Sequence, residues 1–274
     1  MRSLPTGASC TARLAPLALL LTALAACESA SPPGAGEPNG GTTARDSSAA
    51  NSDSPVPGLG GVWTNNPPES TRAFQNFSFS AEPPALTAWG RERYEQSKPT
   101  FGDRGVAVGE TNDPVYECFP PGTPRVYLHP FPVELIETPG RVLMVFEYDH
   151  LIRQVYTDGR EHRTDLAPMW MGDSIGRWEG DTLVVDTTNF NDKGWLDRRG
   201  VPHSDQLHVE ERFHLVDADN LQIDIRIEDP VALAEPWVSQ RFLMRTDWQI
   251  EEHACKDNVN FEGYEENIQQ FEGN

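Results

Sequence analysis

Positive charge is scarce in this sequence of 274 residues. Its 22 lysines and arginines are outnumbered by 42 aspartates and glutamates, which gives a formal net charge of −20. Proteins that bind nucleic acids need a basic surface to neutralise phosphates. The charge balance therefore predicts no nucleic-acid partner, and it disfavours adhesion of the folded part to anionic lipid.

Several enzyme signatures are also missing. The chain has no Gly-x-Ser-x-Gly elbow, no phosphate-binding glycine loop and no dinucleotide-binding fingerprint. It has no His-Glu-x-x-His and no pair of Cys-x-x-Cys motifs, and the spacing of His203, Asp205 and His208 matches no zinc site. We therefore expect no cofactor and no metal ion, and a serine hydrolase is disfavoured.

No apolar run reaches the length of a comfortable membrane span. The longest, Leu14–Leu24, follows a positively charged start and leads into Leu-Ala-Ala-Cys27, which resembles a bacterial lipobox. Residues 1–27 are thus predicted to be a lipoprotein signal peptide, with Cys27 as the lipidated residue; an ordinary signal peptide is the alternative. Because Glu28 follows Cys27 in place of an aspartate, we expect the outer membrane, facing the periplasm or the cell surface, with the lipid as the only membrane contact.

Large apolar side chains are almost absent from residues 28–58, which are rich in Ser, Pro and Gly. Such a segment buries too little surface to offset its ordering entropy, so it is predicted to be a disordered tether. Residues 59–256 are then one β domain, and residues 257–274 an acidic C-terminal tail. Within that domain only Cys118 and Cys255 are cysteines, and export to an oxidising compartment predicts a disulfide between them; two buried thiols are the alternative.

Strand patterns dominate the chain from about residue 126 onward. The clearest is residues 221–228, where leucine and isoleucines alternate with polar residues, as in a half-buried antiparallel strand. Tight turns containing Gly, Pro, Asp or Asn separate the strands. The predicted strands are residues 126–129, 132–137, 142–148, 151–157, 174–178, 182–187, 207–216, 221–228 and 238–253.

The predicted fold is mainly β, an antiparallel meander that closes as a barrel or packs as a sandwich. Gly61-Val62-Trp63 resembles the first strand of lipocalin-type barrels, so a lipocalin-like shape is expected. One short helix is predicted near residues 88–97, with Thr87 as its N-cap.

Five stretches resemble a widespread group of exported bacterial β-rich proteins, most of them uncharacterised. The resemblance extends over about residues 59–256 and implies export and a β domain. It transfers no catalytic residue. The stretches are residues 112–125, 147–160, 175–187, 190–192 and 203–212.

The first candidate site combines Tyr148, His150 and Tyr156, which lie an even number of residues apart and would share one strand face. If that face lines a cavity, His150 is the candidate proton carrier, and Asp186 or Glu211 would orient its ring. His150, Asp186 and Glu211 are thus the predicted catalytic residues. The alternative is a surface turn at His150 without chemistry.

Further candidate ligand-binding residues are polar groups and tryptophans of the β domain. Tryptophans suit a partly apolar ligand, although most tryptophans in a β domain fill its core. Together with Tyr148 and Tyr156, the predicted ligand-binding residues are Arg153, Trp170, Trp178 and His208.

Three functions remain open on the sequence alone. The first is a lipid-anchored cell-envelope protein whose β domain binds a small, partly apolar molecule. The second is a cofactor-independent envelope enzyme, a hydratase, isomerase or hydrolase, that uses His150 with an acidic partner. The third is a structural envelope protein without a pocket. A histidine and a carboxylate converging in a closed pocket would favour the enzyme, and an apolar pocket the binding protein.

Overall fold

The computed structural model describes residues 58–258, with side chains up to Lys256. The predicted signal peptide, the lipidated Cys27, almost all of the tether and most of the acidic tail lie outside the described residues. In the described part no helix is long and apolar enough to cross a membrane.

Nine strands form a closed barrel, in which each strand pairs with its neighbours in the chain and the last pairs with the first. All pairs are antiparallel except β4 with β5, which are parallel and joined by the long connection of residues 157–172. The prediction of a barrel or sandwich is therefore resolved in favour of the barrel. The strands are β1 (Gly61–Asn65), β2 (Val133–Thr138), β3 (Arg141–Phe146), β4 (Ile152–Tyr156), β5 (Asp173–Glu179), β6 (Thr182–Thr188), β7 (His208–Leu215), β8 (Asn220–Glu228) and β9 (Trp237–Thr246).

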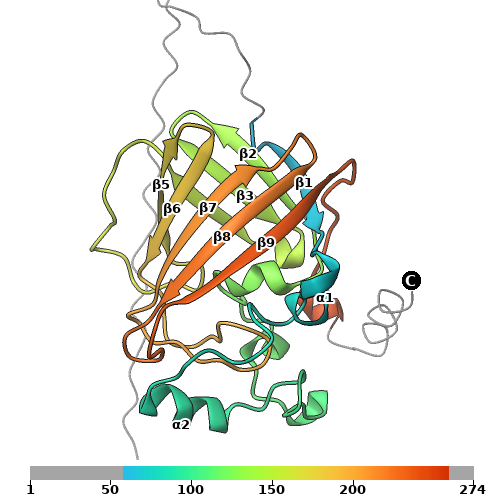
Figure 1. Cartoon of the computed structure of the whole chain (residues 1–274), viewed down its shortest axis with the longest axis vertical. Coiled ribbons are helices and arrows are strands. Elements are labelled where there is room, and N and C mark those ends of the chain that lie inside the picture. Colours follow the sequence, from blue (N-terminus) through green and yellow to red (C-terminus); the bar gives the residue numbers. More distant parts are fainter. Residues whose placement is uncertain (1–57, 259–274) are drawn as a thin grey trace, which may run out of the picture. The chain divides into compact units, whose positions relative to one another are not determined.

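Short helices lie mainly in the connections of the barrel, and α1, α2 and the long connections gather at one end of it (Figure 1). The α-helices are α1 (Glu69–Gln75), α2 (Ala88–Gln96) and α3 (Cys255–Asn258). The 3₁₀ helices are η1 (Val108–Glu110), η2 (Pro114–Glu117), η3 (Arg125–Leu128) and η4 (Tyr148–His150).

Helix α2 confirms the helix predicted at residues 88–97, including its cap. The Thr87 hydroxyl accepts a hydrogen bond from the Gly90 amide at 3.0 Å. Gly90 also explains how α2 docks, because a Cβ at this position would lie 2.1 Å from the carbonyl oxygen of Ala232. Helix α1 was not predicted; its sequence, Glu-Ser-Thr-Arg-Ala-Phe-Gln, carries little apolar periodicity.

The core fills the barrel. Ile223, Ile225 and Ile227 on β8 are 0–2 % exposed, while Arg226 faces solvent, so the predicted alternation is confirmed. Hydrophobic residues of β1–β3, β6, β7 and β9 complete this interior cluster. Trp63, the tryptophan of the lipocalin-like pattern, is fully buried among them.

Residues 126–129 are not the strand that the sequence predicted. They form η3 and the residue after it, and Val126, Tyr127 and Leu128 are buried against the barrel core. The segment leaves the strand conformation because Pro124 precedes it and Pro130 follows it, and proline cannot donate to a strand ladder. The last predicted strand is also too long, since β9 ends at Thr246.

The disulfide predicted between Cys118 and Cys255 is present, with 5.6 Å between the two Cα atoms. It ties the residue that follows η2 to the first residue of α3, 137 positions later. Segments distant in the sequence are thereby held beside η3.

Candidate functional site

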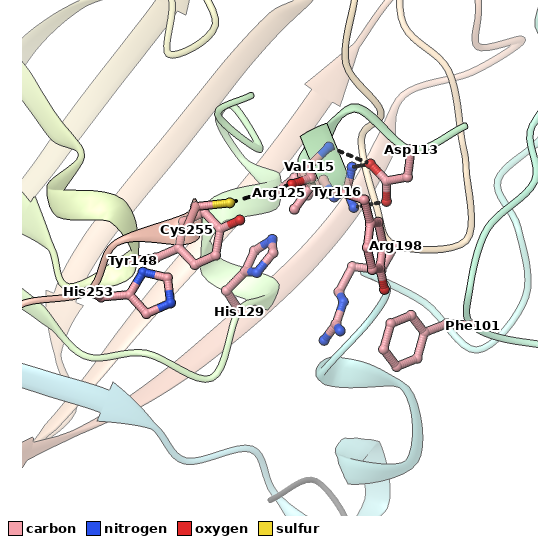
Figure 2. A pocket seen from close by; sticks show the side chains of 10 residues that line it. All are labelled: Phe101, Asp113, Val115, Tyr116, Arg125, His129, Tyr148, Arg198, His253 and Cys255. Atoms are coloured by element: carbon pink, nitrogen blue, oxygen red, sulfur yellow. Dashed lines mark hydrogen bonds and ion pairs between the residues drawn. The ribbon is translucent and has the colours of Figure 1, made fainter. Parts of the chain in front are cut away.

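A cavity of about 40 Å³ lies where η2, η3, η4 and the segment after β9 meet. Figure 2 shows the side chains that line it, with His129 in the middle, Tyr148 and His253 on one side, and Arg198 with Phe101 on the other. Cys255 of the disulfide also lines it. The cavity therefore depends on contacts between segments that lie far apart in the chain.

One wall is fixed by a buried ion pair. Arg125 donates to both carboxylate oxygens of Asp113, at 2.9 and 2.5 Å, and both side chains are 2 % exposed. Asp113 also accepts a hydrogen bond from the Val115 amide at 3.1 Å and so caps η2. Burial alone would lower the pKa of Arg125, but the charge of Asp113 outweighs it, and the pKa is raised. The pair is thus a rigid, internally neutralised part of the wall.

The ring of His129 is the central polar group of the cavity. It is 4 % exposed, and neither ring nitrogen has a hydrogen-bond partner among the described residues. Its centroid lies 4.5 Å from that of Tyr148. Burial lowers the pKa of His129 well below its ordinary value, and the charges of Arg198 and Arg125 lower it further. At neutral pH this imidazole is uncharged, with one nitrogen free to accept and one free to donate.

Arg198 brings a positive charge that no carboxylate of the described residues neutralises. It is 5 % exposed and takes part in none of the ion pairs formed within residues 58–256. One guanidinium nitrogen donates to the Asn76 carbonyl at 3.0 Å, and the group lies 3.8 Å from the centroid of Phe101. Such stacking supports a planar cation but does not cancel its charge.

The backbone around Arg198 is held firmly. The Asp197 carboxylate accepts hydrogen bonds from the Ser78 hydroxyl at 2.7 Å and from the amides of Arg199 and Val201 at 3.0 and 3.1 Å. The Arg198 amide donates to the Phe77 carbonyl at 2.8 Å. These contacts fix the direction in which the Arg198 side chain leaves the loop.

The remaining wall connects η4 to the end of the domain. The Asp149 amide donates to Nδ1 of His253 at 3.0 Å, and the Asp149 carboxylate accepts from the Cys255 amide at 3.2 Å. His253 packs against Tyr148 with ring centroids 5.1 Å apart. The segment after β9, predicted as strand, instead closes the cavity.

The predicted site around His150 is wrong in its geometry. Asp149 and His150 both have positive φ, 52° and 48°, so the chain turns here and does not continue a strand. Tyr148 is buried in the cavity wall, whereas His150 is exposed and Tyr156 lies on the outer wall with Arg160 over its ring at 3.7 Å. The three residues do not share a face. Asp186 instead pairs with His162 and His208, and Glu211 pairs with Arg153.

Glu211 and Arg153 instead form an ion pair inside the barrel. Both guanidinium Nη atoms of Arg153 donate to the Glu211 carboxylate, one at 2.9 Å, and the side chains are 0–1 % exposed. The other donors of Arg153 reach Ser174, Tyr127 and Thr187 at 2.8–3.0 Å. Because every donor is used within the network, this pair organises the barrel interior and leaves no group free for a ligand.

Asp186 and His208 lie together on the outer wall, in a row that also contains His162. Asp186 is 2.7 Å from Nε2 of His162 through one oxygen and 2.7 Å from Nε2 of His208 through the other. Nδ1 of His162 lies 2.9 Å from the Asp173 carboxylate, and Nδ1 of His208 lies 3.3 Å from the Glu228 carboxylate. The bond to Asp186 raises the pKa of His208, and the bond from His208 lowers that of Asp186. No group of three or more His, Cys, Asp or Glu within the described residues could hold a metal ion.

The predicted tryptophans do not line the cavity. Trp170 stacks on Phe119 with centroids 5.4 Å apart, and Trp178 is 42 % exposed on β5. The sequence interpretation missed His129, Arg198 and His253. Two of them had a signal: His129 stands directly before Pro-Phe-Pro, and Arg198 lies in Asp-Arg-Arg-Gly. Those patterns mark loops, which hold binding residues more often than strands do.

Fold and site together define a closed β-barrel with a small cavity at its helical connections, lined by His129, two arginines and Asp113. No protein-family model matches the sequence, and no curated protein matches it either.

Proposed function

We propose that this is a lipid-anchored cell-envelope protein whose β domain binds a small, partly apolar molecule in the cavity around His129. The observation that carries the proposal is the buried His129 ring, whose two nitrogens have no partner among the described residues. Leaving a buried polar group unpaired costs about 1–3 kcal/mol, which a ligand that bonds to the ring recovers. The aromatic rings of Phe101, Tyr116 and Tyr148 suit the apolar part of such a molecule.

The barrel interior is a poorer candidate for the ligand. Trp63, Phe213 and the ion pair of Arg153 with Glu211 fill it, and all four side chains are at most 2 % exposed. A barrel of this width is filled by its own side chains or holds one small ligand, and here the side chains occupy it. The cavity, by contrast, offers both ring nitrogens of His129.

A cofactor-independent enzyme is the second candidate, with His129 in place of His150. A neutral histidine in a partly enclosed cavity is suited to accept a proton, and Tyr148 packs directly against it. Binding is the preferred function because no carboxylate orients the His129 ring among the described residues.

Ligand-observed NMR with fragments of fewer than about ten heavy atoms tests the proposal on the purified full chain. Binding to the wild type and to His214→Phe on the outer wall, together with loss of binding in His129→Phe, supports it. If no fragment binds, or if His129→Phe binds them equally well, the proposal fails. Conversion of a bound fragment during the measurement would favour the enzyme.

The lipid anchor has its own test. Metabolic labelling with a fatty acid should mark the wild type and not Cys27→Ser, which should leave the membrane fraction. Equal labelling of both proteins would contradict the anchor while leaving the cavity untouched.

A further inference from the structure

We infer that the group held in this cavity is a carboxylate, bound between Arg198 and His129, so that the ligand is a small organic acid with an apolar remainder. The inference rests on the proposed function and names its ligand class. It follows from the charges, the free hydrogen-bonding groups and the size of the cavity.

The charges around His129 favour an anion. Arg125 and Asp113 neutralise each other, and the carboxylate of Asp149 is engaged by the Cys255 amide. His253 presents a partly buried ring whose pKa is lowered by burial. Arg198 remains as a cation without a carboxylate partner among the described residues, and its charge reaches His129. A buried cation of this kind costs free energy until an anion pairs with it.

The hydrogen-bonding groups match a carboxylate. The guanidinium of Arg198 uses one nitrogen for the Asn76 carbonyl and is planar, as the bidentate recognition of two oxygens requires. His129 can donate from one ring nitrogen. Both groups line the same cavity from two different segments (Figure 2).

The size of the cavity limits the ligand to a small head group. About 40 Å³ holds roughly three water-sized groups, which matches the carbon and the two oxygens of a carboxylate. The rest of the molecule would lie at the mouth, where Phe101 and Tyr116 are only partly buried. These rings suit a flat apolar or aromatic remainder.

Binding of an acid should be coupled to a proton. Burial is the main reason why the pKa of His129 is low, and the positive charge of Arg198 lowers it further; a bound carboxylate offsets that charge and therefore favours the charged imidazolium. The protein therefore takes up a proton when the acid binds. The affinity for the acid rises as the pH falls toward the pKa of His129 in the ligand-free protein. The neighbouring titratable groups are Asp113, Asp149, Asp197, His253 and Tyr148, and they are present both in the free protein and in the complex.

Isothermal titration of the purified full chain with benzoate and with benzyl alcohol, its neutral counterpart, tests the inference. We expect benzoate to bind about 10-fold or more tightly than benzyl alcohol, as charged hydrogen bonds predict. Benzoate binding should release heat that depends on the ionisation enthalpy of the buffer. Arg198→Gln should remove the preference, Arg198→Lys should keep part of it, and Arg226→Gln on the outer wall should leave it unchanged.

The outcomes separate the inference from the proposed function. Equal affinity for the two probes, or a benzoate preference that survives in Arg198→Gln, overturns the carboxylate inference while small-molecule binding stands. If neither probe binds the wild type, the carboxylate inference falls, and the fragment measurement under Proposed function decides the proposed function. Circular dichroism of Arg198→Gln and Arg198→Lys confirms that loss of binding is not loss of fold.

Discussion

Replacing Glu211 by glutamine should destabilise the barrel by about 3–5 kcal/mol, the cost of removing one partner of a buried ion pair. Glutamine keeps the size of the side chain but removes its charge. Arg153, 1 % exposed, would then remain charged in the interior, with the amide oxygen of the new glutamine and the hydroxyls of Tyr127, Ser174 and Thr187 as partners but no carboxylate. Since most domains are stable by about 5–15 kcal/mol, a large share of the folding free energy would be lost.

Removing both charges should cost less than removing one. In Arg153→Met with Glu211→Leu, the hydroxyls of Ser174 and Thr187 retain each other at 3.1 Å, and the Tyr127 hydroxyl retains the Met144 sulfur at 3.6 Å. Apolar replacement of a whole buried pair is often neutral or stabilising by about 1–4 kcal/mol. Urea unfolding followed by tryptophan fluorescence gives each free energy.

The control for this cycle is the exposed pair of Arg177 and Glu179, whose side chains are 60 % and 41 % exposed. Arg177→Met should change the unfolding free energy by less than about 0.5 kcal/mol. The reasoning is refuted if Glu211→Gln costs under about 1 kcal/mol, or if the double variant costs the sum of its two single changes.

Three further predictions concern stability. Replacing Cys118 and Cys255 by serine opens a link across 137 positions and should lower the unfolding free energy by up to about 5 kcal/mol, with non-reducing mass mapping to show the native bond. Ile225→Ala, at a position 2 % exposed, should cost about 2–5 kcal/mol in the same urea assay; a loss below half a kcal/mol would mean that the position is not packed. The pKa of His208 is raised in the folded state, so its bond to Asp186 contributes fully below the ordinary histidine value and is lost as the pH rises through the folded value. Between pH 6 and 9 the unfolding free energy should therefore decline less steeply in His208→Gln than in the wild type. The difference should be less than about 1 kcal/mol because the His208 side chain is a third exposed.

The fold could be predicted where one face of an element is buried. The alternation of β8 follows from burial on one side only, and the cap of α2 from a local hydrogen bond. The disulfide followed from the expected compartment and from the presence of only two cysteines in the domain. These features depend on residues close in sequence or on simple counting.

The site could not be predicted in the same way, because the chain turns where a strand was expected. The positive φ of Asp149 and His150 reverses the direction of the side chains, and a period-two pattern holds only while the strand continues. His129 belongs to a segment between Pro124 and Pro130, and Arg198 lies in a loop 69 positions later. Only tertiary packing brings both residues to the same cavity. Glu211 was predicted to be catalytic and Arg153 to bind the ligand, whereas their pairing inside the barrel depends on its closure and is not visible in the sequence.

The most direct measurement of the central claim is a long-range ¹H–¹⁵N spectrum of the histidine rings while benzoate is added to the purified full chain at pH 7. The account predicts that the signals of His129 shift and saturate, that its pKa rises in the complex, and that His214 on the outer wall is unaffected. Unchanged His129 signals at saturating benzoate, or shifts confined to the exposed histidines, would contradict the account.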